Sequence, residues 1–110
     1  MADDGVQLLP GTLEMMVLKV LSVGEEHGWG IGQRLQEMSR GTFDVNQGSL
    51  YPALQRLLKK GWIVSDWRQT ESGRRARYYR LTRSGVVKLE REQESWARQV
   101  AAVNWVLRWT

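Results

Sequence analysis

The sequence predicts an α+β fold that is mainly helical with one small β-hairpin. Three observations predict it: three stretches of helical periodicity before residue 61, two β-rich runs on either side of a glycine-containing loop, and a long apolar seam after Thr82. The chain has 110 residues, which corresponds to one small domain. Such a chain buries a modest core, so a partner chain is a plausible source of further buried surface.

The first two helices are expected on either side of Gly24. Start signals at Pro10 to Thr12 precede apolar residues at helical spacing, namely Leu13, Met16, Val17, Val20 and Leu21. The second helix follows in "HGWGIGQRLQEM", with His27 as a helix-start residue and one stripe formed by Ile31, Leu35 and Met38. Gly41 is expected to cap its end. The glycines at its start predict tight packing against its neighbours, because their spacing fits no nucleotide-binding loop.

A third helix is expected in "NQGSLYPALQRLLKKGW", where Gly61 ends it. Its buried stripe consists of Leu50, Leu54, Leu57 and Leu58, and its opposite side of Gln47, Tyr51 and Gln55. Proline is tolerated in a first turn, so Pro52 predicts that the helix begins near Gln47 to Ser49. Free backbone N–H groups then lie beside polar side chains. Such an end suits phosphate oxygens and base edges, although Asn and Ser also favour helix starts for local reasons.

The hairpin is expected from "WIVSDWRQ" and "RRARYYRL", which flank the loop "TESG". Its tip and second strand carry four arginines: Arg74, Arg75, Arg77 and Arg80. Arg80, close to the body of the domain, is expected to pair with an acid. Trp62 and Trp67 flank the first strand and are interpreted as packing residues.

The last helix is expected to run from an N-cap at Thr82 to the end of the chain. Its seam consists of Val86, Leu89, Gln93, Trp96, Val100, Val103 and Leu107, at alternating spacings of three and four residues. One interpretation pairs the seam with a second copy of the chain in a symmetric homodimer. In the alternative interpretation this helix folds back over the first two helices. Both interpretations could hold, each for different turns of the helix.

Positive charge is concentrated in the middle third of the chain. Residues 45–83 contain nine basic and two acidic residues, whereas residues 1–44 contain three basic and seven acidic ones. This asymmetry favours a polyanionic partner, although basic segments are also often solvated faces. Three helices, a hairpin and a long helix form the order of a winged helix-turn-helix with an added dimerisation helix. In that arrangement the third helix enters the DNA major groove and the hairpin, or wing, lies on the backbone.

These expectations assign DNA contacts to two regions. The recognition-helix contacts are Asn46, Gln47, Ser49, Tyr51, Gln55 and Arg56, and the wing contacts are Arg74, Arg75 and Arg77. Lys59 and Lys60 are interpreted at least equally as charges that complement the helix dipole. The expected partner is a double-stranded DNA operator.

Four blocks, "LLPGTLEMMVLKVL", "HGWGIGQRL", "GSLYPALQRLLKKGWI" and "RRARYYRLTRSG", resemble the PadR family of bacterial transcriptional regulators in order and spacing. The resemblance implies a homodimeric winged-helix repressor, often released from DNA by a small, frequently aromatic ligand. It also maps Pro52 onto the start of the recognition helix and Tyr78 onto the wing. The expected division is a tail at 1–9, a DNA-binding domain at 10–82 and a dimerisation helix at 83–110.

Several classes of function are disfavoured by composition. The chain has no cysteine and one histidine, so disulfides, multi-histidine metal sites and a catalytic triad are not expected, and neither are an enzyme activity nor a cofactor. The start lacks the features of a signal peptide, and no apolar run suits a membrane helix. A cytoplasmic protein is therefore expected.

Trp96 raises the question of a ligand, because as a seam residue it would face its symmetry mate across a dimer axis. Two facing indoles usually pack together, but splayed helices would leave a slot for a flat aromatic effector. Two readings compete with an effector-controlled repressor: a winged-helix protein-interaction module, and a DNA-binding repressor without an effector.

Overall fold

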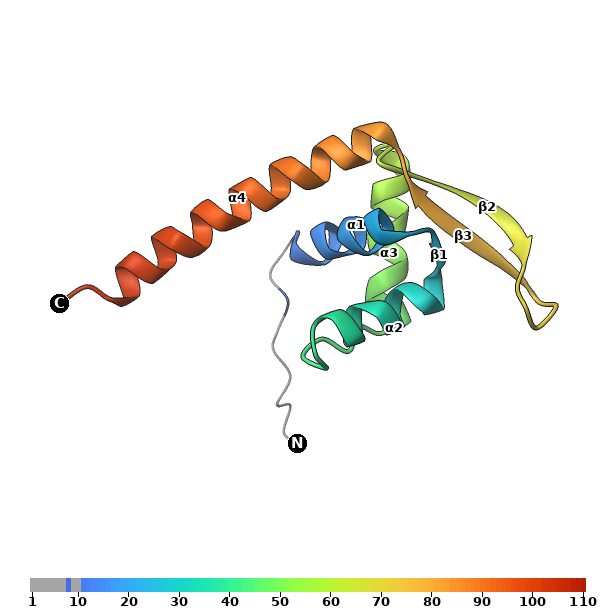
Figure 1. The fold of residues 1–110 in the computed structure, drawn as a ribbon, viewed down its shortest axis with the longest axis horizontal. Helices are drawn as coiled ribbons and strands as arrows, with labels where there is room; N and C mark the ends of the chain where they lie inside the picture. The colour runs from blue at the N-terminus through green and yellow to red at the C-terminus, as the bar shows by residue number, and fades with distance from the viewer. Residues whose placement is uncertain (1–7, 9–10) are drawn as a thin grey trace.

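Four helices and three strands follow one another in the computed structural model, which describes residue 8 and residues 11–110 (Figure 1). They are α1 (Thr12–Val23), β1 (Glu26–His27), α2 (Gly28–Met38), α3 (Gln47–Lys59), β2 (Ile63–Gln69), β3 (Arg75–Leu81) and α4 (Arg83–Leu107). The predicted α+β class and the predicted order of helices and hairpin are confirmed. The predicted tail at 1–9 lies outside the described residues except for Leu8, which packs against the core.

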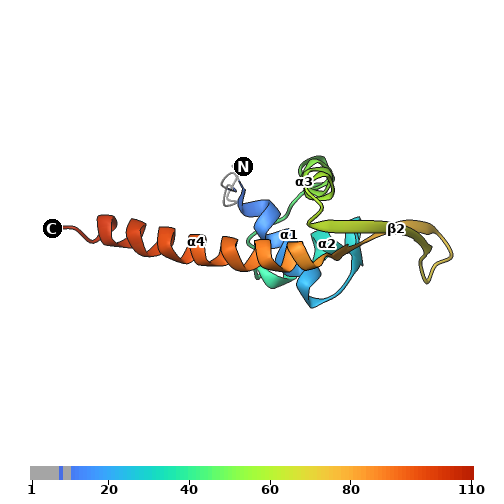
Figure 2. The same cartoon turned by 90° about the horizontal axis from the view of Figure 1, so that it is seen from above.

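The core lies where α1, α2 and α3 meet the base of the sheet. α1 contributes more buried residues than any other element, because its apolar stripe is buried from Leu13 to Leu21. Ile31 and Leu35 come from α2, and Leu50, Leu54 and Leu57 from α3, as their helical spacing predicted. Figure 2 shows α3 end-on while α4 runs across the view, so the two helix axes cross steeply. This arrangement leaves the far side of α3 uncovered.

The three-stranded sheet has the order β1-β3-β2 and is antiparallel throughout. The predicted hairpin is confirmed, but its extra edge strand β1 was not anticipated: Glu26 pairs with Tyr79 and His27 with Tyr78. In the hairpin, Tyr79 lies opposite Ser65. Because side chains alternate between the two faces of a sheet, each hairpin face carries its own set of groups.

Two helix ends differ from their predicted chemistry. At the end of α2 both Arg40, with φ of 55°, and the following Gly41, with φ of 79°, are left-handed. The Arg40 N–H bonds to Glu37 and the Gly41 N–H bonds to Gln36, which is a Schellman ending with Arg40 at the position expected for glycine. In α3, Pro52 is the sixth helical residue and so lies in the second turn rather than the first. The Gly48 carbonyl consequently lacks its usual helical donor.

Glycines matter most at the junction of α3, the sheet and α4. A Cβ on Gly85 would lie 2.0 Å from the Trp62 carbonyl oxygen, so the first turn of α4 can approach this backbone only because residue 85 is glycine. In α2, a Cβ on Gly32 would make ordinary contacts at 3.8 Å or more. The prediction that the glycines of α2 are needed for tight packing therefore fails at Gly32.

The two halves of α4 have different surroundings. Leu89 in the first half is buried against the core, although the seam had assigned it to the dimer interface. The second half projects away from the body of the domain (Figure 1). Its seam residues Val100, Val103 and Leu107 are exposed by 38%, 54% and 75%. The first half thus follows the fold-back interpretation, except that its helix partner is α1 and not α2 as well. No part of the described chain covers the second half.

Candidate nucleic-acid interface

α3 presents one uncovered stripe, which we call its outer face: Gly48, Pro52, Gln55 and Lys59. Residues at these spacings of four, three and four lie along one side of a helix, and all four are exposed. Gly48 has no side chain and Pro52 has only a flat ring, so few atoms project from the first half of this face. Gln55 and Lys59 supply hydrogen-bonding and charged groups on the second half, so the face combines a close approach with polar contacts.

The start of α3 is built by Asn46. Its side-chain Oδ1 accepts a hydrogen bond from the Ser49 N–H at 2.9 Å, so the local capping role weighed from the sequence is present. Asn46 and Ser49 remain exposed at the positive end of the helix dipole. Gln47 differs, because its side-chain amide lies within 3.9 Å of where Cβ atoms of Gly28 and Gly32 would stand. It therefore packs between α2 and α3 instead of pointing outward.

A hollow of about 390 Å³ separates one flank of α3 from the sheet, and we call it the wing groove. It is lined by His27, Gly28, Trp29, Tyr51, Gln55, Trp67, Arg75, Ala76, Arg77 and Tyr79. Tyr51 is half exposed, and its hydroxyl is directed toward Gly28 of α2. The groove thus joins aromatic surfaces to two of the arginines predicted for the wing.

Stacking and hydrogen bonds hold the two groove arginines. The Arg75 guanidinium lies 5.5 Å from the centroid of the Trp67 ring, and that of Arg77 lies 5.8 Å from the Tyr79 ring. The Arg77 Nε also donates a 2.7 Å hydrogen bond to the Ser65 hydroxyl. These contacts orient both cations toward one face of the hairpin, so less side-chain entropy is lost when an anion binds.

Arg74 occupies the tip of the hairpin, where it is exposed. The turn is closed by the Thr70 N–H donating to the Arg74 carbonyl and by the Gly73 N–H donating to the Thr70 carbonyl. Gly73 has φ of 85°, a conformation that side chains with a Cβ rarely adopt. The tip is therefore narrow, with a cation at its end.

Tyr78 lies on the opposite face of the hairpin from Arg75 and Arg77, because it alternates with them along β3. Its neighbours there are the Arg68 guanidinium, 5.2 Å from its ring centroid, and the edge of His27. The predicted DNA contact by Tyr78 thus starts from a different face than the other wing contacts.

An ion-pair network occupies this second face. Arg68 forms an ion pair with Glu25 and a second one with Asp66, in which its Nε lies 2.8 Å from the Asp66 Oδ2. Hydrogen bonding to Arg68 lowers the pKa of both the Glu25 and the Asp66 carboxyl. Asp66 also pairs with Arg80 at 3.5 Å, so the prediction that Arg80 meets an acid is confirmed. The network anchors the wing to the loop before β1.

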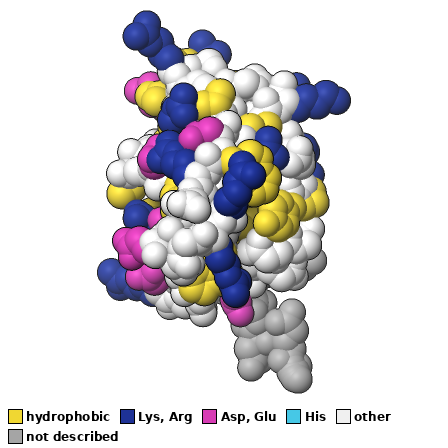
Figure 3. All heavy atoms as spheres, turned by 90° about the vertical axis from the view of Figure 1, so that its right-hand side faces the viewer, with side chains coloured by type: hydrophobic (Ala, Val, Ile, Leu, Met, Phe, Trp, Pro, Cys, Tyr) yellow, Lys and Arg dark blue, Asp and Glu magenta, His cyan; other side chains and the backbone are white. Residues whose placement is uncertain are grey.

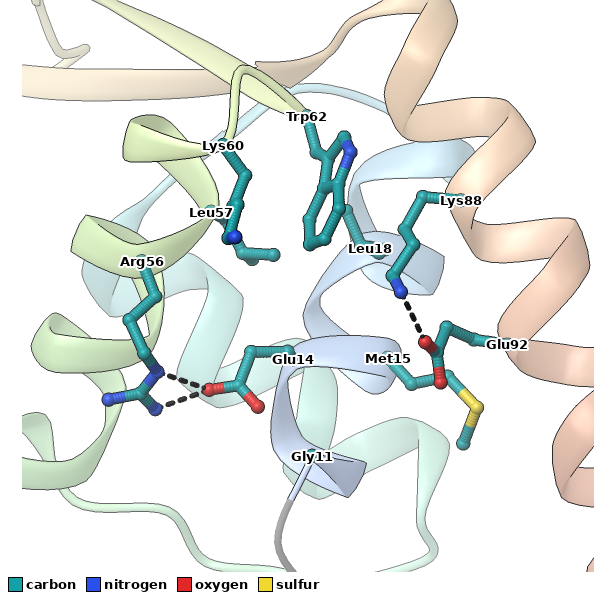
Figure 4. Close-up of a pocket in the computed structure, with 10 residues that line it drawn as sticks. All are labelled: Gly11, Glu14, Met15, Leu18, Arg56, Leu57, Lys60, Trp62, Lys88 and Glu92. Atoms are coloured by element: carbon teal, nitrogen blue, oxygen red, sulfur yellow. Dashed lines mark hydrogen bonds and ion pairs between the residues drawn. The ribbon is translucent and has the colours of Figure 1, made fainter.

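On its other flank α3 packs on α1, and a second hollow lies between α3 and α4 (Figure 4). Arg56, predicted to contact DNA, forms an ion pair with Glu14 of α1 through its Nε and terminal nitrogen. Lys60 lies one turn further along this flank. These two cations border this second hollow, which is separate from the wing groove.

The hairpin end of the molecule is predominantly basic on its surface. In Figure 3 lysine and arginine side chains are spread over this end, with exposed hydrophobic side chains between them, while acidic side chains gather mainly toward one side. Such a mixture suits an anionic polymer with apolar sugar surfaces. Within residues 11–110 and Leu8, no cluster of His, Asp and Glu has the arrangement of a metal site.

Three groups at this surface were missed or underrated from the sequence. Trp67, interpreted as a packing residue, is 59% exposed in the wing groove, and Trp29 faces the same groove. Lys59, interpreted at least equally as a charge for the helix dipole, lies on the outer face of α3. Trp67 lies on the same face of β2 as Ile63, which is buried at the base of the hairpin, so strand alternation carried no signal that Trp67 is exposed.

An uncovered helix beside a basic hairpin, on a three-helix core with an extended fourth helix, defines a winged helix-turn-helix transcriptional regulator. Residues 17–91 match the transcriptional regulator PadR-like family. The chain belongs to this family, as its sequence motifs indicated, and it is a transcriptional regulator and not an enzyme.

Relatives support this assignment. The crystal structure of a PadR-like transcriptional regulator from Bacillus cereus is 30% identical, with a TM-score of 0.80 over 96% of this chain and 100% of that one. A Streptococcus transcriptional regulator is 31% identical, with a TM-score of 0.80 over 94% of this chain and 99% of that one. The transcriptional regulator Rv3488 of Mycobacterium tuberculosis is 41% identical over 68 residues, which span 59% of this chain and 63% of Rv3488.

Proposed function

We propose that this protein is a homodimeric repressor that binds a pseudo-palindromic operator through α3 and the wing of each protomer. The observation that carries the proposal is the uncovered outer face of α3 next to the wing groove. The outer face would enter the major groove, while Arg74, Arg75 and Arg77 would neutralise phosphates of the neighbouring strand. A regulator that occupies a promoter in this way blocks transcription, and it would do so in the cytoplasm.

The second half of α4 supports a dimer. Trp96, Val100, Val103 and Leu107 form a continuous exposed apolar stripe, which is a typical surface for association. A second copy covers it by symmetry, because the same stripe on the partner is its complement. Two recognition helices would then face the same side of DNA about 34 Å apart, which is one helical turn.

Selection of binding sequences from a pool of random duplexes tests this function. The selected sequences are expected to contain an inverted repeat whose half-sites are about 10 base pairs apart. Sedimentation with a labelled selected duplex should give two protein chains per site. A single asymmetric half-site, or a complex with one chain, would contradict the dimeric arrangement.

Tyr51 provides a test at the level of one residue. Tyr51→Phe keeps the ring that packs over α2 and removes only the hydroxyl. If that hydroxyl contacts a base, operator affinity falls by about 1–3 kcal/mol while affinity for random DNA changes little. Equal losses on both duplexes would assign the hydroxyl to the DNA backbone.

We further propose that a small aromatic effector binds beside Trp96 at the dimer interface. A hollow of about 250 Å³ lies between α1 and α4, and its lining includes Met15, Met16, Leu89 and Trp96. Flexible thioethers and an indole suit a flat apolar ligand. Planar aromatic compounds should raise the melting temperature of the wild type more than that of Trp96→Ala and should release the operator. Absence of both effects across a compound series would leave a repressor without an effector at this site.

A further inference from the structure

The wing groove exposes more aromatic surface than contacts with phosphates account for. Trp29 is 63% exposed and Trp67 59%, and the half-exposed Tyr51 lies in the same hollow. The bases of a duplex cannot reach these rings, because each base is stacked between its neighbours. The duplex contacts proposed for Arg75 and Arg77 therefore leave two exposed indoles unexplained.

The two indoles come from different elements around the wing groove. Trp67 lies on the hairpin, directly across the strand pair from Arg77, with the Arg75 guanidinium 5.5 Å from its ring centroid. Trp29 lies in the first turn of α2, where it stacks with His27 at a centroid distance of 6.4 Å. Each indole thus has one partner within the protein, and its exposed surface borders the groove.

The cations of the wing form a row along the hairpin. Arg75 and Arg77 are about 7 Å apart on one face of β3, because alternate residues of a strand are separated by twice its rise. The exposed Arg74 follows at the tip. Successive phosphates of one strand can therefore meet successive arginines, whereas the phosphate of a free mononucleotide would use only part of the row.

We propose that the wing groove binds single-stranded DNA, with one unpaired base against the indoles of Trp29 and Trp67. The phosphates on either side of this base lie on Arg75 and Arg77. Every base has a flat π-face, so stacking of this kind tolerates any sequence. The groove of about 390 Å³ lies near the lower end of the usual range for ligand sites, roughly 300–1,000 Å³, which suits a single nucleotide. Gln55 also lines the groove, and its amide can hydrogen-bond to the edge of the base.

The choice of DNA over RNA rests on the proposed function, because the outer face of α3 beside the groove is the surface proposed to hold duplex DNA. A single strand in the groove uses the arginines that would neutralise duplex phosphates. Single-stranded DNA and the operator duplex therefore compete for the wing, and each weakens binding of the other by the same factor.

Fluorescence anisotropy of labelled strands, measured with the full chain at low salt, tests the site. A short oligothymidylate should bind, and a strand of equal length with abasic sugars should bind about tenfold more weakly, because it keeps the phosphates and lacks the bases. Trp29→Ala should weaken binding of the oligothymidylate and leave binding of the abasic strand unchanged, since Trp29 holds neither arginine. Trp105→Ala is the matched control, because this indole is 69% exposed on α4 outside the groove, and it should change neither affinity.

Three results overturn the proposal: equal affinities for the two strands, equal affinities of Trp29→Ala and Trp105→Ala for the oligothymidylate, or competition by thymidine monophosphate as strong as that by the strand. Melting curves establish that each variant is folded. Tighter binding of an oligouridylate overturns the choice of DNA alone, and an operator affinity unchanged by the oligothymidylate overturns the competition alone. If the protein bound no duplex, the proposed function would fail while the comparison of the two strands still decided the groove.

Discussion

Replacement of Arg74, Arg75 and Arg77 by alanine should flatten the salt dependence of DNA binding. Each phosphate contact contributes about 0.9 to the slope of log affinity against log salt concentration, so three contacts contribute about 2.7. Between 50 and 200 mM salt, affinity changes roughly 3.5-fold for each contact and about 40-fold for three. The wild type should therefore lose about 40-fold more affinity than the triple variant over this interval.

The structure supplies two matched controls for this prediction. Arg80→Ala removes the same charge from the same strand, but Arg80 lies on the opposite face and pairs with Asp66. Its slope should equal that of the wild type. Arg77→Lys keeps the charge but loses the guanidinium contact with Ser65 and Tyr79, so its slope should be unchanged while its affinity falls.

Fluorescence anisotropy of a labelled duplex at four salt concentrations measures these slopes. Melting curves of the same samples show whether each variant is folded. Equal slopes for the wild type and the triple variant would remove the wing from the DNA interface. A slope for Arg80→Ala as low as that of the triple variant would show that the face of the hairpin does not matter, which would refute the geometric argument.

Three further predictions concern the scaffold. Gly85→Ala should lower the free energy of unfolding by about 1–3 kcal/mol or more, because the added Cβ has no room. Gly32→Ala should be neutral or stabilising by up to about 1 kcal/mol, because its Cβ would make only ordinary contacts. Urea denaturation of the two variants measures the difference. Val103→Glu should shift sedimentation equilibrium toward the monomer because it places charge in the seam, and Arg98→Glu on the opposite side of α4 should not. Pairing with Arg68 lowers the pKa of Glu25 from 4.5 and that of Asp66 from 3.8, so the stability that these carboxylates contribute is present above about pH 4.5 and is lost as pH falls through the lowered values. In Arg68→Met the melting temperature should therefore depend less on pH between pH 3 and 6.

Local patterns predicted most of the fold. The N-caps His27, Asn46 and Thr82 follow from residue types whose side chains accept a hydrogen bond from a free backbone N–H. The start of α1 at Thr12 follows from the apolar stripe that begins there, since its N-cap Gly11 makes no side-chain cap. The end of α3 at Gly61 follows from its left-handed conformation. Strand β1 was missed because two residues carry no periodicity, and its pairing with β3 spans more than 50 positions of the chain.

The site was predicted less completely, because the side of α3 and the face of the hairpin that remain accessible depend on packing between elements. Residue type placed Arg75 and Arg77 correctly on the hairpin, and alternation along the strand already separates Tyr78 from them, but packing decides which of the two faces borders α3. Helical spacing placed Gln47 beside Tyr51. Gln47 instead packs against Gly28 and Gly32 because α2 lies close to α3 at this point, and helical spacing carries no information about this tertiary contact.

The seam of α4 illustrates how one sequence pattern can serve two environments. Its repeat is uniform from Leu89 to Leu107, so periodicity alone could not decide between a fold-back and a dimer. The structure divides it because α1 reaches only the first turns. Since the helix continues without a break, the covered half holds the uncovered half in a fixed direction.

The junction at residues 60–62 and 82–85 is where the three functional elements meet, and its rigidity gives the proposed mechanism its geometry. The Thr82 and Ser84 hydroxyls both donate to the Gly61 carbonyl, at 2.8 and 3.1 Å, and the Thr82 N–H donates to Trp62. These hydrogen bonds join the end of α3, the base of the wing and the start of α4, and the Trp62 carbonyl leaves no room for a side chain at Gly85. A dimer formed through the far half of α4 would fix the separation of the two α3 helices through this junction.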